Sequence, residues 1–125
     1  MIIGIGLDIV DIARVESLLE RHDERALERL FSPEEIRYCT AQKKPAMHFA
    51  ARFAAREACS KALGSGIGSQ AGWRDMEVLR DAAGQPTLQL TGSAGQLAGT
   101  LGVGSIFLSL THTDSHAAAV VVLEG

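Results

Sequence analysis

The chain has 125 residues, a length that gives one domain rather than two. Its formal net charge of −3 argues against a general nucleic-acid-binding protein, which would carry an excess of basic residues. The apolar fraction of 46% is ordinary for a soluble globular protein, and no apolar run approaches membrane-spanning length.

The cysteines and the first residues bear on where the protein works. Cys39 and Cys59 have no second cysteine at metal-site or redox-motif spacing, so we expect reduced, semi-buried packing residues. Residues 1–10 are apolar but contain no basic residue and no cleavage-like site, which argues against a signal peptide. We therefore expect a cytoplasmic protein with no membrane partner.

The chain begins with a predicted strand and a predicted helix. Residues 2–10 are rich in β-branched side chains, and Gly4 and Gly6 are typical of a strand that another backbone approaches closely. Asp11 can cap the following helix, whose apolar side chains recur at helical spacing from residue 12 onward. We expect a break in this pattern around residues 22–23.

Two further helices are predicted before the middle of the chain. Residues 32–35 read Ser-Pro-Glu-Glu, which combines an N-cap, a proline at the first helical position and the glutamate of a capping box. This helix should run to about Thr40, and the Lys-Lys-Pro of residues 43–45 should end it. Residues 46–63 are rich in alanine and lack glycine and proline, so they predict the longest helix, which closes at Gly64.

The second half of the chain predicts strands joined by short turns. We expect strands at residues 76–80 and 86–91, a helix at 93–101, and a terminal hairpin of residues 105–111 and 116–123. Strands that follow each other through short turns favour an antiparallel sheet. The predicted fold is α+β, with a small antiparallel sheet packed against one long helix and shorter helices, in a single domain of residues 1–125.

Three segments carry side chains suited to chemistry. Asp8 lies in an apolar strand pattern, where a lone carboxylate is costly unless it is paired, protonated or bound to a metal; an exposed strand-end aspartate is an equally good interpretation. Glu57, Lys61 and Gly64 share one face of the longest helix. An isolated surface Glu–Lys pair is the ordinary interpretation, but the neighbouring side chains are almost all apolar. The helix also leads into a glycine-rich loop whose N–H groups could approach phosphate. His112 ends a strand, either as a turn residue or as a donor to phosphate.

Together these segments favour a site for Mg²⁺ and phosphate. Mg²⁺ typically takes one or two protein carboxylates and completes its coordination with water and substrate phosphates, so Asp8 and Glu57 would be sufficient. A Walker-type nucleotide site is excluded, because the sequence contains no Gly-x4-Gly-Lys-Ser/Thr run.

The same residues resemble the holo-acyl-carrier-protein synthase family, the small phosphopantetheinyl transferases. Three patterns match this family in order, and the match spans nearly the whole chain: Gly6-x-Asp8, Arg52-Phe53-Ala54-x-x-Glu57-Ala58-x-x-Lys61-Ala62-x-Gly64, and Ser109-x-Thr111-His112. One departure is Arg56, where the family commonly has lysine. Because guanidinium and ammonium groups bind phosphate differently, we assign Arg56 no role.

The resemblance implies an enzyme of fatty acid biosynthesis that moves the 4′-phosphopantetheine group of coenzyme A onto a serine of an acyl carrier protein. It implies a homotrimer with active sites between subunits, and Mg²⁺ bound by Asp8 and Glu57. Lys61 would be the third catalytic residue, near the pyrophosphate. The implied coenzyme A contacts are Arg52, Gly64, Ser65, Gly66 and His112, the last from an adjacent subunit. The base that takes the serine proton stays open between Glu57 and a water that it orients.

An acidic carrier protein requires a local basic surface, and the first helix offers one. At 100° per residue, the side chains of Arg14, Leu18, Arg21 and Arg25 fall within roughly 60° of one another, and Arg29 joins them if the helix continues. Interspersed glutamates make a solvated face the ordinary interpretation of such a stripe. Given the resemblance, we predict that these residues bind the carrier, with Arg14 and Arg21 central.

Three alternatives fit parts of the sequence. A noncatalytic trimeric module that holds coenzyme A or a carrier domain would not need Asp8 and Glu57 together. A transferase for polyketide or peptide-synthesis carriers is closer, but such enzymes are often of double length. The third alternative is a catalytic domain of a larger synthase.

Overall fold

The computed structural model describes residues 1–21 and 24–125 of the chain. Its elements follow in the order β1 (Ile2–Asp11), α1 (Ile12–Glu20), α2 (Glu24–Leu30), α3 (Pro33–Thr40), α4 (Pro45–Leu63), the 3-10 turn η1 (Trp73–Asp75), β2 (Met76–Arg80), β3 (Pro86–Leu90), α5 (Gly92–Leu101), β4 (Ser105–His112) and β5 (His116–Glu124). The α+β class is confirmed, and the element bounds differ from the predicted ones by a residue or two. The break expected at residues 22–23 lies outside the described residues.

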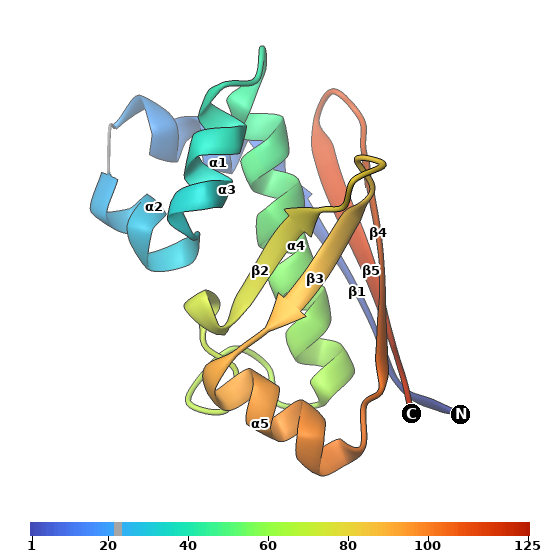
Figure 1. Cartoon of the computed structure of the whole chain (residues 1–125). Coiled ribbons are helices and arrows are strands. Elements are labelled where there is room, and N and C mark those ends of the chain that lie inside the picture. The colour runs from blue at the N-terminus through green and yellow to red at the C-terminus, as the bar shows by residue number, and fades with distance from the viewer. Residues whose placement is uncertain (22–23) are drawn as a thin grey trace.

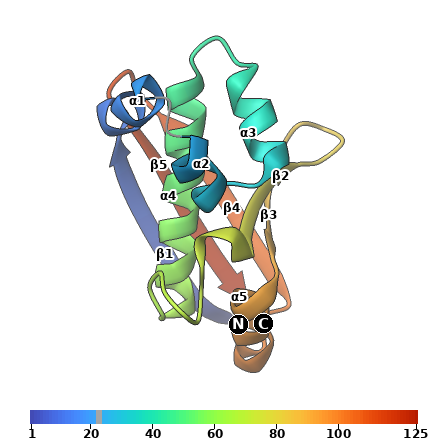
Figure 2. The same cartoon turned by 90° about the vertical axis from the view of Figure 1, so that its left-hand side faces the viewer.

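The helix α4 is the centre of the fold. It packs against β1, β5 and β4 on one side and against α1, α3 and β2 on the others (Figure 1). Figure 2 shows α4 in the middle, with β1 on one side and α3 and the β2–β3 hairpin on the other. Because most side chains of α4 are buried and small, neighbouring backbones come close to it from several directions.

Local helix signals in the sequence are mostly confirmed. Ser32 and Glu35 form the predicted capping box at the start of α3, with the Ser32 N–H donating to Glu35 Oε1 at 2.9 Å and the Glu35 N–H donating to Ser32 Oγ at 3.2 Å. The expectation for Pro45 was wrong: α3 ends at Thr40, and Pro45 is the first residue of α4. Proline suits that position, because the first N–H groups of a helix have no acceptor within the helix.

The strands form two antiparallel sheets rather than the one that we expected. One sheet has the order β1-β5-β4, and the hairpin of β2 and β3 forms the other. In the first sheet Asp8 pairs with Ala119 of β5, which in turn pairs with Leu110 of β4. Turn residues, which can be recognised in the sequence, determine which strands pair within a hairpin. Whether two hairpins join into one sheet depends on how each packs on α4, and this is not visible in the sequence.

Two glycines allow β1 to lie directly against α4, as the sequence predicted. A Cβ added at Gly4 would lie 2.0 Å from the Ala62 carbonyl oxygen, and one added at Gly6 would lie 1.7 Å from the Ala58 carbonyl oxygen. No larger residue fits either position without moving the backbone. The side chain of Asp8, two residues after Gly6, faces α4 as a result.

Both cysteines are fully buried and free, which is deeper than the semi-buried positions that we expected. Burial raises the pKa of the Cys39 thiol to about 11 and that of Cys59 to about 12, so both are inert packing residues. None of the described helices combines the length and apolar character that crossing a membrane requires.

Candidate active site

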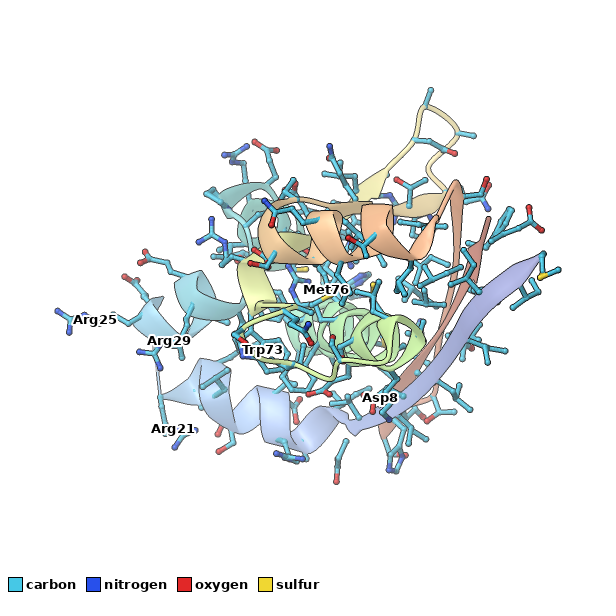
Figure 3. All side chains as sticks on the ribbon, turned by 90° about the horizontal axis from the view of Figure 1, so that it is seen from below. Asp8, Arg21, Arg25, Arg29, Trp73 and Met76 are labelled. Carbon is cyan, nitrogen blue, oxygen red and sulfur yellow. The ribbon has the colours of Figure 1, made fainter. Side chains whose placement is uncertain are left out.

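A pair of carboxylates meets where β1 crosses α4. Asp8 comes from β1, and Figure 3 shows it on the side of that strand that faces the helix. Glu57 comes from α4 and is half-buried. The pKa of Glu57 is raised, first by burial and then by the negative charge of Asp8, while Lys61 opposes the shift. The two acids are therefore close enough to repel each other, and we call them the carboxylate pair.

Lys61 lies beside this pair, one helical turn after Glu57. Its ammonium group donates to Asp8 Oδ1 at 3.1 Å and to the Leu7 carbonyl oxygen at 3.0 Å. The site thus holds two carboxylates and one exposed ammonium group. Within residues 1–21 and 24–125, no group of three or more His, Cys, Asp or Glu side chains could hold a metal. A set of two carboxylates suits Mg²⁺, which prefers oxygen ligands and leaves most positions to water and phosphate.

The loop after α4 is less open to phosphate than the sequence suggested. Gly64 ends the helix in the left-handed conformation, with a φ of 82°. The N–H of Gly64 donates to the Lys61 carbonyl oxygen, and those of Ser65 and Gly66 both donate to the Ser60 carbonyl oxygen. The N–H groups predicted to contact phosphate are therefore engaged in ending the helix.

Arg52 and His112 belong to a second group of side chains, which we call the cation cluster: His48, Arg52, Arg80 and His112. The side chains of His48, Arg52 and Arg80 all contact the ring of Tyr38. The pKa of His48 is lowered, first by burial and then by the charges of Arg52, His112 and Arg80. Sequence reasoning missed His48 and Arg80. His48 could have been found from its spacing, because residues four apart on a helix are neighbours and Arg52 was already a candidate.

The carboxylate pair and the cation cluster lie on opposite sides of α4. At 100° per residue, the directions of His48 and Arg52 are roughly 180° from those of Glu57 and Lys61. The sheet agrees, because Asp8 is on β1 and His112 on β4, with β5 between these two edge strands. One copy of the chain therefore does not bring the predicted metal ligands together with Arg52 and His112.

Arg56, which has no predicted role, is a core residue. It is fully buried and pairs with both carboxylate oxygens of Glu35, and its Nε donates to the Trp73 carbonyl oxygen at 2.9 Å. Glu35 also accepts the Val78 N–H at 3.1 Å. The pair joins α3, α4, η1 and β2, so Arg56 is not exposed for contact with phosphate.

The predicted carrier-binding residues are only partly brought together. Arg14, Leu18 and Arg21 line a cavity of about 240 Å³, which Phe53 of α4 also lines. The single-helix geometry was wrong for Arg25, because α1 ends at Glu20 and Arg25 belongs to α2. Figure 3 nevertheless shows Arg21, Arg25 and Arg29 extending from the same end of the molecule.

Comparisons with known proteins agree over the whole chain. Residues 4–121 match the family model described as the 4′-phosphopantetheinyl transferase superfamily. The holo-[acyl-carrier-protein] synthase of Geotalea daltonii is 46% identical over 124 residues, 99% of each chain. That of Moorella thermoacetica is 47% identical over 119 residues, 95% of this chain and 91% of the relative.

Solved structures agree as well. The chain resembles the crystal structure of the Neisseria meningitidis synthase with a TM-score of 0.90 and 32% identity over 100% of both chains. It also resembles the Helicobacter pylori synthase in complex with coenzyme A, with a TM-score of 0.84 and 35% identity over 96% of this chain and 99% of that one.

Proposed function

Because the chain belongs to the 4′-phosphopantetheinyl transferase superfamily, we propose that it transfers the 4′-phosphopantetheine group of coenzyme A to a serine of an apo-acyl carrier protein, for fatty acid biosynthesis. The observation that carries this proposal is the carboxylate pair with Lys61 beside it. Two acids and a cation at one half-buried position suit the transfer of a charged phosphoryl group. The free, buried cysteines are in keeping with the cytoplasmic location that we propose.

Asp8 and Glu57 are the residues that would hold Mg²⁺, and their oxygen-only donor set fits that ion. When bound, Mg²⁺ neutralises charge on the phosphates of the donor. The Oγ of the carrier serine forms a bond to the phosphorus that bears the pantetheine arm. The bond from that phosphorus to the bridging oxygen breaks, and adenosine 3′,5′-bisphosphate leaves with the electron pair.

The protein side chains align these groups and handle the proton. Glu57, with its raised pKa, is the proposed acceptor of the serine proton, directly or through a water. Lys61 is in place to neutralise the departing phosphate. Arg52 and His112 are the proposed contacts to the phosphates of coenzyme A. Gly64, Ser65 and Gly66 are proposed only to border the donor, because their N–H groups are engaged in ending α4.

One assay tests the transfer directly. The protein is incubated with coenzyme A, Mg²⁺ and an apo-acyl carrier protein, and the carrier should gain the mass of one phosphopantetheine group. Asp8→Asn and Glu57→Gln should each lower the rate by at least about 100-fold, while Glu77→Gln on β2 should not. Near-normal rates in both variants would refute the proposed ligands. Binding of coenzyme A without any transfer would favour the noncatalytic module instead.

A homotrimer is the assembly that we propose, and the outer face of the three-stranded sheet supports it. Ile5, Leu7 and Ile9 of β1 point away from α4 and are 67%, 66% and 67% exposed, and Phe107 of β4 is 53% exposed. An apolar patch of this kind on a small protein marks an interaction surface. Contact between copies would cover it and could bring the cation cluster of one copy to the carboxylate pair of the next.

Mixed assemblies test whether the site is shared between copies. One variant carries Glu57→Gln, and the other carries His112→Ala with Arg80→Ala, both of which are exposed positions. Each should be inactive alone. In a random 1:1 mixture about a quarter of the sites would combine two intact halves, and activity should return to that fraction. No recovery in mixtures whose mixed composition is confirmed by native mass spectrometry would contradict a shared site.

The cavity lined by Arg14, Leu18 and Arg21 is the proposed docking site for the carrier, and Arg25, which extends from the same end of the molecule as Arg21 (Figure 3), is a further candidate contact. An apolar floor rimmed by arginines suits an acidic amphipathic helix. Reversing the charges of Arg14 and Arg21 should raise KM for the carrier far more than KM for coenzyme A. Arg37→Glu, at an exposed position on α3 that does not line this cavity, is the control and should leave KM for the carrier unchanged. Equal effects of the Arg14 and Arg21 reversals on both KM values would count against this site.

A further inference from the structure

Tyr38 of α3 lies at the centre of the cation cluster, and nothing proposed above makes use of it. Its ring centroid is 4.6 Å from the guanidinium carbon of Arg52 and 5.0 Å from that of Arg80. The ring of His48 meets it edge-on at 5.9 Å. Its hydroxyl oxygen accepts a hydrogen bond from Arg80 Nη1 at 2.7 Å. One aromatic side chain thus contacts three of the four members of the cluster, which come from α4 and β2.

The two arginines around this ring lack a counter-ion in the described part of the chain. Arg52 is only 3% exposed, and its Nε has no hydrogen-bond partner there. A cavity of about 310 Å³ is lined by Tyr38, Arg52 and Arg80. Two carboxylates also line the cavity, but each already pairs with another arginine: Glu34 with Arg37, and Glu35 with Arg56. A buried guanidinium without a counter-ion is costly, so the cavity is suited to an anion from outside.

We propose that Tyr38 is a positioning residue that orients Arg52 and Arg80 so that both bind one phosphate group of coenzyme A. This inference rests on the proposed function, and it adds Arg80 to the donor-binding residues. An aromatic face attracts a guanidinium group without neutralising it, whereas a carboxylate in the same place would form an ion pair and block the ligand. Two oriented guanidinium groups can then each offer a fork of N–H donors to the phosphate oxygens.

Steady-state kinetics of two Tyr38 variants test this role. Tyr38→Phe keeps the ring and removes the acceptor for Arg80, so KM for coenzyme A should rise about fivefold. Tyr38→Leu removes the ring as well, and KM for coenzyme A should rise by at least about tenfold. In both variants kcat and KM for the carrier should stay within about twofold of the wild type. Thr40→Ala, two residues later on α3 at an exposed position that does not line the cavity, should change none of these values.

A second donor shows which phosphate is bound. Dephospho-coenzyme A lacks the ribose 3′-phosphate but keeps the pyrophosphate. If the arginines bind the 3′-phosphate, Tyr38→Leu should leave KM for dephospho-coenzyme A at its wild-type value; if they bind the pyrophosphate, KM should rise for both donors. Either pattern supports the positioning role.

Other results would overturn it. Tyr38 would be a packing residue only if KM for coenzyme A were unchanged in Tyr38→Leu. The same conclusion would follow if kcat fell and KM for the carrier rose by as much as KM for coenzyme A. If Tyr38→Leu does not fold, Tyr38→Phe is compared with and without Arg80→Ala. In the Arg80→Ala protein, Tyr38→Phe should cause no further rise in KM for coenzyme A, because the hydrogen bond that it removes is already absent. A further rise of about fivefold would refute the coupling between Tyr38 and Arg80. Wild-type protein that transfers from neither donor would instead refute the proposed function.

Discussion

Replacing Gly6 with alanine tests whether the contact between β1 and α4 builds the carboxylate pair. The new Cβ would lie 1.7 Å from the Ala58 carbonyl oxygen, 2.7 Å from its carbon and 2.9 Å from the Ala62 nitrogen. All three are backbone atoms, so no side-chain rotation relieves the overlap. Since non-bonded contacts need about 3.5 Å, β1 must move away from α4 by roughly 1.5–2 Å.

The displacement should be visible in both stability and activity. Overpacking costs typically about 1–3 kcal/mol, and we expect the upper end of this range because backbone opposes backbone. For a chain of this size, this corresponds to a Tm lowered by about 10 °C, measured by calorimetry or circular dichroism. Transfer activity should fall even at temperatures where the variant is folded, because Asp8 is carried away from Glu57.

Gly99→Ala in α5 is the matched control. A Cβ added there meets nothing within 4 Å. Alanine inside a helix is favoured over glycine by about 1 kcal/mol, so this variant should be as stable as the wild type or slightly more so. A Gly6→Ala protein with wild-type Tm and full activity would refute the argument that this contact requires glycine.

Three further outcomes follow from the buried and charged groups. Arg56→Met should lower the free energy of unfolding by about 3–5 kcal/mol in urea titrations, because it leaves Glu35 buried and unpaired; a loss below about 1 kcal/mol would contradict this. The raised pKa of Glu57 means that the folded state binds a proton on this carboxyl group more tightly than the unfolded state does. The free energy of unfolding therefore falls as the pH rises and Glu57 loses that proton. Glu57→Gln should therefore raise Tm slightly in metal-free protein near neutral pH but not below about pH 4, and an equal gain at both pH values would contradict this cause. Adding Mg²⁺ should raise Tm of the wild type and not of Glu57→Gln, and removal by EDTA should reverse the gain; an equal rise in both proteins would argue against Glu57 as a ligand.

The parts of the fold that could be predicted are those set by residues close together in sequence. The capping box at Ser32 and the helix end at Gly64 each depend on contacts within one helical turn. The close approach at Gly6 could be predicted because glycine weakens a strand and is kept there where a second backbone needs the space. Asp8 and Glu57 are far apart in sequence, and the residues alone left open whether Asp8 has a partner; the family resemblance was what indicated that the two acids belong to one site.

The parts that could not be predicted depend on how separate elements pack. The role of Arg56 requires Glu35 on another helix, and nothing near either residue indicates the pair. Tyr38 has the same difficulty, because its contact with Arg80 joins α3 to β2. The single-helix geometry used for Arg25 was wrong because α1 ends at Glu20 and Arg25 belongs to α2.

Two packing contacts on different sides of α4 account for the placement of the carboxylate pair and of Arg52 in the cation cluster. On the side of β1, Gly4 and Gly6 fix the depth at which the strand meets the helix, and this brings Asp8 to Glu57. On the side of α3, the ion pair of Arg56 with Glu35 fixes how that helix lies against α4, and Tyr38, three residues after Glu35, meets Arg52 in consequence. Because each contact places one group of side chains on the same helix, a change in either contact should disturb that group and leave the other in place.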